Sequence, residues 1–196
     1  TRDATDQAGA EAACATNIRK VWPLLFSMAK TAEGRAKLTT AFKLCKPRAS
    51  EADGMRLALM HLNAFDTMAM GNFPYPSNYL IFQQTHNPTV KLPAFPVREA
   101  CKKLKGPFAD PPAADLLTAM ADASGVFYNV TGIKCYDLPT DPDFDGIWDY
   151  QWCTEMLPQE TYFTRDGVHD MFWPEPMDMA AINAHCNSTL GVVPRP

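Results

Sequence analysis

Six cysteines are spread over this chain of 196 residues, and they constrain its fold more than any other feature. They are Cys14, Cys45, Cys101, Cys135, Cys153 and Cys186, with no Cys-x-x-Cys pair and no nearby histidine at zinc-ligand spacing. This distribution favours disulfides over zinc and indicates an oxidising compartment, either the secretory route or a lysosomal or vacuolar lumen. Spacing alone does not choose among the possible pairings.

Two glycosylation sequons agree with such a compartment. Asn129 and Asn187 each begin an Asn-x-Thr pattern, whereas the similar pattern at Asn87 is blocked by Pro88. We therefore predict N-glycosylation at Asn129 and Asn187. The chain begins at Thr1 without a signal peptide, and we expect it to be a processed or excised piece.

Charge and hydropathy exclude two classes of partner. The net charge is −4, the isoelectric point is near 5.5, and the longest basic cluster lies at residues 102–105, so we expect no nucleic-acid binding. Charged residues or prolines interrupt every apolar run, so we expect no membrane span. A hydrophobic content of 46% is enough for a packed core in one or two domains.

The periodicity of apolar residues is mainly helical. After a loose lead-in at residues 1–10, it predicts a helix over residues 11–30, which Pro23 should kink or restart. A second helix is predicted around residues 38–45, ended by Pro47.

The longest predicted helix follows residues 50–53, which resemble a capping box with Asp53 in place of glutamate. Its apolar stripe consists of Met55, Leu59, Leu62, Phe65 and Ala69. The helix should end at Gly71, and His61 falls on its polar side.

Prolines organise the next stretch. Residues 72–96 contain five of them and predict an extended loop without an interior helix or strand. Pro96 can occupy the first position of a short helix that Gly106 stops, and Pro112 can open a further helix that ends near Gly125.

No catalytic residue is predicted. None of the five serines lies in a Gly-x-Ser-x-Gly elbow. The four histidines are scattered, and we interpret each as a surface or packing residue rather than a general base. They are His61, His86, His169 and His185. We expect no cofactor.

One acidic segment resembles part of a calcium loop. Asp141, Asp143 and Asp145 alternate before Gly146, as in the first half of such a loop. The second half fails, because Trp152 stands where a bidentate glutamate belongs. A solvated acidic turn is therefore favoured, and no metal site is predicted.

Several ordered motifs carry a family resemblance. They are Phe-Pro-Tyr-Pro at 73–76, Trp-Asp-Tyr-Gln-Trp-Cys-Thr-Glu at 148–155, Asp-Gly-Val-His-Asp-Met-Phe at 166–172, Cys186, and Gly-Val-Val-Pro-Arg-Pro at 191–196. This set resembles the serine exopeptidases that include lysosomal Pro-Xaa carboxypeptidase and dipeptidyl peptidase II. The resemblance implies a mainly α, disulfide-linked helical cap, the SKS domain of an α/β-hydrolase, with irregular proline-rich loops and without the Ser, Asp and His of the triad.

The resemblance also implies disulfide pairs and boundaries. It pairs Cys14 with Cys101, Cys45 with Cys135, and Cys153 with Cys186. Many relatives have a fourth bridge, which this chain cannot form in the usual way. The cap would occupy residues 11–147, and residues 148–196 would lead back toward the hydrolase core.

Residues 148–155 are the best candidate site. The resemblance implies a strand-like segment that faces the hydrolase active site and contributes to a pocket for proline. The candidate substrate-binding residues are Trp148, Asp149, Met156 and Leu157. Asp149 suits capture of a peptide α-ammonium and leans toward the dipeptidyl peptidase II branch. The alternative is that these aromatic residues belong to the core and that Cys153 is structural.

Two functions remain open from the sequence. In the first, the chain gates peptide substrates for the missing α/β-hydrolase portion of a secreted or lysosomal exopeptidase and is inactive alone. In the second, it is a stand-alone, non-catalytic binding module derived from the cap. An exposed apolar face would favour the first, and a polar one the second.

Overall fold

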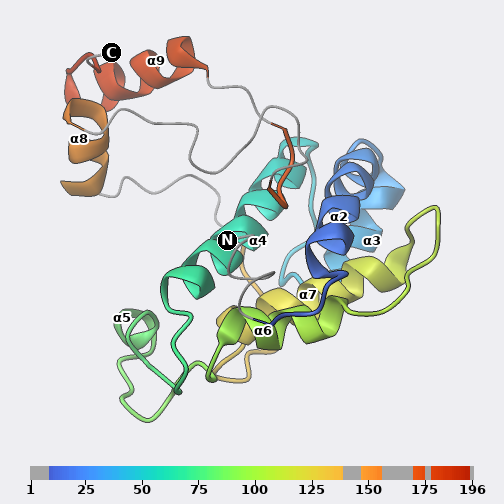
Figure 1. Cartoon of the computed structure of the whole chain (residues 1–196). Helices are drawn as coiled ribbons and strands as arrows, with labels where there is room; N and C mark the ends of the chain where they lie inside the picture. Colours follow the sequence, from blue (N-terminus) through green and yellow to red (C-terminus); the bar gives the residue numbers. More distant parts are fainter. Residues whose placement is uncertain (1–8, 139–146, 156–169, 175–177, 195–196) are drawn as a thin grey trace. The chain divides into compact units, whose positions relative to one another are not determined.

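The computed structural model describes residues 9–138, 147–155, 170–174 and 178–194. It divides into two compact units, residues 1–138 and residues 139–196, which are treated separately (Figure 1). The described residues are mainly helical, with two isolated β-bridges, which confirms the predicted fold class. None of the described helices is long and apolar enough to cross a bilayer.

Helix α2, Cys14–Ala29, is the first helix in the described part of unit 1. It buries Ile18, Val21 and Leu25 as the periodicity predicts. The expected kink or restart is wrong, because the helix continues through Pro23. Pro23 lies on the exposed face, where water can replace the backbone hydrogen bond that proline cannot make.

Helix α3, Ala32–Ala41, begins and ends earlier than predicted. The Thr31 hydroxyl caps it by accepting a hydrogen bond from the Gly34 N–H at 3.0 Å. The helix is already over at Cys45, because the backbone there pairs with Tyr136 instead: the Cys45 N–H donates to the Tyr136 carbonyl at 2.9 Å.

Helix α4, Ala52–Met70, ends at Gly71 as predicted. The Asp53 carboxylate accepts hydrogen bonds from the backbone N–H groups of Ala49 and Ser50, both at 3.1 Å, as the capping pattern indicates. The predicted stripe is partly wrong, because Met55 and Leu59 are exposed. The buried face is rotated from it and includes Leu57, Ala58, His61, Leu62, Ala64, Phe65 and Met68.

The proline-rich stretch is a loop, but it contains one short helix. Ser77 and Leu92 exchange two backbone hydrogen bonds, at 3.1 and 2.8 Å, which close the loop. Helix α5, Phe82–Thr85, was not expected there. No proline lies between Pro76 and Pro88, so a helical turn is permitted there.

Of the next two helices, the first begins at the predicted proline, but the second does not end at the predicted glycine. Helix α6, Pro96–Cys101, has proline at its first position as predicted, and the 3-10 helix η1, Lys102–Leu104, follows it. Helix α7, Ala114–Tyr128, does not end near Gly125. A Cβ atom at Gly125 would lie 3.3 Å from the Tyr136 hydroxyl, so this glycine allows close packing within the helix.

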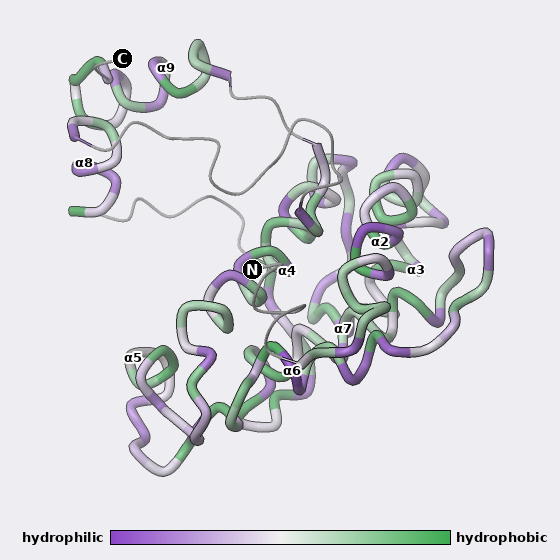
Figure 2. The backbone as a smooth tube through the Cα atoms, in the orientation of Figure 1, coloured by the Kyte–Doolittle hydropathy of each residue, from purple (hydrophilic) through white to green (hydrophobic). Residues whose placement is uncertain are grey.

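The core of unit 1 lies between helices α2, α3, α4, α6 and α7, and Figure 2 shows apolar stretches along α4 and α7. Its largest fully buried side chains include Trp22, Phe42, Phe65, Phe127, Ile18, Leu25 and Met68. Two disulfides join distant parts of this unit, Cys14–Cys101 and Cys45–Cys135, with sequence separations of 87 and 90. Both pairs are those implied by the family resemblance.

Unit 2 contains helix α8, Ile147–Thr154, and helix α9, Met179–Leu190. The Cys153–Cys186 disulfide joins them and is the third implied pair. Asp178 caps α9 by accepting hydrogen bonds from two backbone N–H groups, and Gly191 ends it with φ +67°. The prediction of a strand-like segment at 148–155 is therefore wrong.

Candidate functional site

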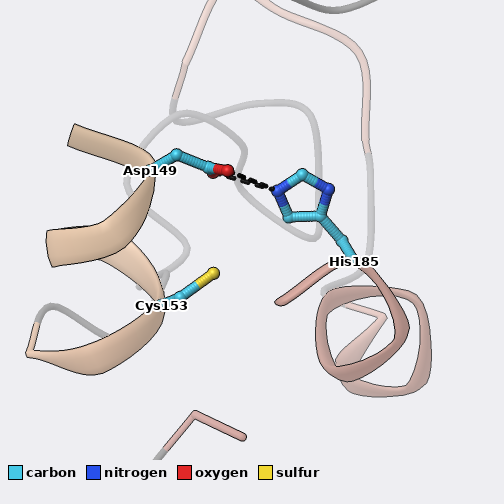
Figure 3. A group of neighbouring side chains, drawn as sticks. All are labelled: Asp149, Cys153 and His185. Carbon is cyan, nitrogen blue, oxygen red and sulfur yellow. Dashed lines mark hydrogen bonds and ion pairs between the residues drawn. The ribbon is translucent and has the colours of Figure 1, made fainter. Parts of the chain in front are cut away.

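Asp149, on α8, faces His185, on α9. The His185 Nε2 lies 2.9 and 3.0 Å from the two carboxylate oxygens of Asp149 (Figure 3). Residues four apart lie on the same face of a helix, so Asp149 and Cys153 both point toward α9. The disulfide from Cys153 to Cys186, the residue after His185, holds the two helices at this point.

Charge is concentrated in this pair. Asp149 and His185 are the only acidic and basic side chains on helices α8 and α9, which are otherwise apolar or uncharged. The Asp149 side chain is 14% exposed and that of His185 is 44% exposed. The Trp152 ring meets the imidazole at a centroid distance of 6.1 Å and an angle of 71°, an edge contact. Solvent therefore meets the imidazole rather than the carboxylate.

The same cluster resembles a metal site, but the described residues do not supply enough ligands for one. Donor atoms of Asp149, Cys153 and His185 lie within 4.8 Å of one another. Cys153 is bonded to Cys186 and offers no thiolate. One carboxylate and one imidazole remain, which is fewer than structural zinc requires.

The predicted site residues are only partly brought together. Asp149 is engaged with His185, whereas Trp148 is 64% exposed. Several features discussed in the sequence analysis lie outside the described residues: Met156, Leu157, His169 and the acidic loop 141–146. His185 was missed as a site residue. The disulfide implied by the family resemblance could have pointed to His185. It joins Cys186, the neighbour of His185, to Cys153, which lies one turn after Asp149.

A second pair that contains a histidine, His61 with Ser124, lies in the core of unit 1. The His61 Nδ1 is 2.7 Å from the Ser124 hydroxyl, and each residue is 2% exposed. The prediction that His61 lies on the polar side of its helix is therefore wrong. It belongs to the buried face, with the Phe42 ring 4.4 Å from its own.

This pair lacks what a nucleophile and base require. Both side chains are buried away from substrate, and burial lowers the pKa of His61 to about 3. The Nε2 atom of His61 has no hydrogen-bond partner in the described part of the chain, so no carboxylate orients the ring. Within that part, His61 is a packing residue, which is one of the two roles that the sequence indicated.

Comparison with known proteins gives a consistent result. No protein-family model matches the chain. Lysosomal Pro-X carboxypeptidase of Bos taurus and that of Homo sapiens are each 32% identical over 187 residues, which is 93% of this chain. Prolyl carboxy peptidase like protein 5 of Caenorhabditis elegans is 30% identical over 152 residues, 71% of this chain and 28% of that protein.

The described residues form mainly helical, disulfide-linked units, and the relatives make the chain a serine peptidase-related region. Over 93% of its length the chain is homologous to lysosomal Pro-X carboxypeptidases, in agreement with the family resemblance of its motifs. The chain spans 35% of the length of the mammalian relatives.

Proposed function

We propose that this chain is the substrate-gating cap region of a serine exopeptidase that cleaves short peptides next to proline. The observation that carries the proposal is a sequence alignment. It covers 93% of the chain and 35% of the length of each mammalian protein named Pro-X carboxypeptidase. In this proposal, residues 11–147 form the cap and residues 148–196 lead toward an α/β-hydrolase portion. That portion, as the partner, supplies the Ser, Asp and His.

The chain alone is inactive in this proposal. Its sequence has no Gly-x-Ser-x-Gly elbow, and Ser124, which lies beside a histidine, is enclosed in the core. Without an activated nucleophile there is no covalent step to accelerate.

Exposed apolar side chains support a docked portion over a stand-alone module. Met55 and Leu59, one turn apart on α4, are 37% and 45% exposed, and Met70 at its end is 63% exposed. Tyr75 and Tyr79 are also exposed, and both contact the Phe73 ring. Such grouped apolar surface is typical of an interface.

The compartment proposed is a lysosomal or secretory lumen. Three disulfides suit oxidising conditions during folding, and the mammalian relatives have names that include the word lysosomal. Both sequon asparagines, Asn129 and Asn187, are exposed and accessible to a glycan. Trp148, Asp149, Met156 and Leu157 remain the proposed substrate-facing residues.

Active-serine labelling tests the proposal. A native, non-denatured preparation is treated with a fluorophosphonate probe, and the labelled polypeptides are resolved by mass. We expect this chain to stay unlabelled and to co-purify with a second polypeptide, or a longer form of itself, that carries the label. Absence of label from every associated species would favour the stand-alone binding module.

A further inference from the structure

We propose that the Cys45–Cys135 disulfide is a thiol-exchange site, which small anionic thiols open while the other two bridges of the chain stay closed. Opening this bridge releases the stretch that follows α7 from the end of α3. The site is separate from the Asp149–His185 pair and independent of the proposed peptidase function.

Solvent access distinguishes this bridge from the other two. Cys45 is exposed and Cys135 is half-buried. The other bridges are covered, since each of their four cysteines is at most 1% exposed. An attacking thiolate must reach a bridge sulfur, so the rate of exchange follows access. Access therefore selects the Cys45–Cys135 bridge.

The charge beside the bridge favours an anionic thiol. Four cationic residues lie within three positions of the two cysteines along the chain, against one carboxylate, Asp137; they are Lys43, Lys46, Arg48 and Lys134. Lys43 is paired with Asp122 at 3.4 Å, which leaves an excess of positive charge. Such an excess raises the local concentration of an anion, and a cation beside a departing thiolate stabilises it.

The exchange proceeds in two balanced steps. The thiolate of the small thiol attacks the Cys45 sulfur and forms a mixed disulfide, while the Cys45–Cys135 bond breaks and its electron pair leaves on Cys135, which takes up a proton. A second molecule of the thiol then attacks the sulfur of the first and releases Cys45 as a thiol. Two small thiols are oxidised to their disulfide, and one protein disulfide is reduced.

The bridge is the covalent link between the end of α3 and the stretch after α7. Two backbone hydrogen bonds accompany it: the Cys45 N–H donates to the Tyr136 carbonyl and the Tyr136 N–H donates to the Lys43 carbonyl, both at 2.9 Å. The Tyr136 ring also meets the Tyr128 ring edge-on at 6.1 Å. Once the bridge is open, only noncovalent contacts hold residues 129–138 against α3, so local opening of this stretch becomes more frequent.

Reduction of the folded, full 196-residue chain tests the inference. The chain is incubated with glutathione at pH 7, samples are alkylated with N-ethylmaleimide, and the modified cysteines are identified by peptide mass. We expect Cys45 and Cys135 to be alkylated roughly tenfold faster than the other four cysteines, with a glutathione mixed disulfide as the intermediate, because exchange depends on access. In denaturant the three rates should converge, since burial then protects no bridge.

Charge variants test the preference for an anion. Lys46→Gln and Lys134→Gln should each slow opening by glutathione roughly twofold but should not slow opening by cysteamine, a cationic thiol. Lys91→Gln, at an exposed lysine of the proline-rich loop, is the matched control and should leave both rates unchanged. Equal slowing of the two thiols would refute the role of charge.

Hydrogen exchange measures the structural consequence. A chain in which only this bridge is reduced and alkylated should exchange faster over residues 129–138 but not in α6, which the intact Cys14–Cys101 bridge holds. A variant with Cys45→Ser and Cys135→Ser should show the same pattern. If that variant does not fold, the alkylated parent chain still provides the comparison.

Two results would overturn the inference. Reduction of all three bridges at one rate in the folded chain, or earlier reduction of another bridge, would show that Cys45–Cys135 is not a selective exchange site. Unchanged hydrogen exchange over residues 129–138 after selective opening would show that the bridge does not hold this stretch in place.

Discussion

The His61 imidazole should make the folding stability of unit 1 strongly dependent on pH. Burial lowers its pKa from 6.5 to about 3, so the folded state keeps the ring neutral at pH values where the unfolded chain protonates it. The unfolded state therefore binds more protons between pH 3 and pH 6.5. Stability from this group is fully present above pH 6.5 and is lost as the pH falls toward 3.

The magnitude follows from the linkage relation. Each pH unit below the pKa of the unfolded state lowers the free energy of unfolding by roughly 1.4 kcal/mol while the folded ring stays neutral. At a pH of about 4.5, which is two units below 6.5, the loss is about 3 kcal/mol. That is a large share of the stability of a small domain.

His61→Asn removes the titration while keeping a polar partner for Ser124 at the position of Nδ1. It should lower stability by about 1 to 2 kcal/mol at neutral pH, because it loses contact with the Phe42 ring. Between pH 7.5 and pH 4.5, however, the variant should lose about 3 kcal/mol less than the parent chain.

Denaturant unfolding followed by circular dichroism across this pH range measures both slopes, with disulfides intact. The control is His86→Asn, at an exposed position with φ +47° that asparagine adopts readily. It should retain the slope of the parent chain. Parallel slopes for His61→Asn and the parent would refute the argument, since burial would then not be holding the ring neutral.

Three further predictions concern packing, covalent links and modification. Gly34→Ala should lower the free energy of unfolding by about 2 kcal/mol in a thermal melt, because the added Cβ would overlap the Met28 carbonyl; Gly106→Ala, with nothing within 4 Å, should be nearly neutral. Replacing Cys153 and Cys186 together by serine should destabilise unit 2 by about 3 kcal/mol, seen as faster hydrogen exchange in α8 and α9 but not in α4; unchanged exchange would contradict this. Asn129→Gln and Asn187→Gln should each remove one glycan from the chain when eukaryotic cells secrete it, as measured by intact mass. Loss of no glycan mass would show that the asparagine is not glycosylated.

The sequence predicted best those elements whose limits are set locally. Helix α4 has a cap near Asp53 and a stop at Gly71, and α6 begins at Pro96, whose ring suits the first helical position. The ends of α3 and α7 were misplaced because tertiary pairing overrides local signals there. Cys45 pairs with the Tyr136 backbone, and Gly125 packs against the Tyr136 side chain.

The site was harder to predict because its contacts are long-range. His185 lies 36 residues from Asp149, and Ser124 lies 63 residues from His61. Helix α8 is short and rich in aromatic residues, a composition that suits a strand equally well. Asp149 and Cys153 share a face only because this segment is helical, and a strand-like reading hides that relation.

The two disulfides of unit 1 overlap along the chain, since Cys45 lies between Cys14 and Cys101, and Cys101 lies between Cys45 and Cys135. A protease that cuts the backbone once anywhere between Cys14 and Cys135 therefore releases nothing, because at least one bridge spans every such cut. Nicked molecules remain single covalent species until they are reduced. In a compartment rich in proteases, clipping within the proline-rich loop would leave the two halves of the unit tethered to each other.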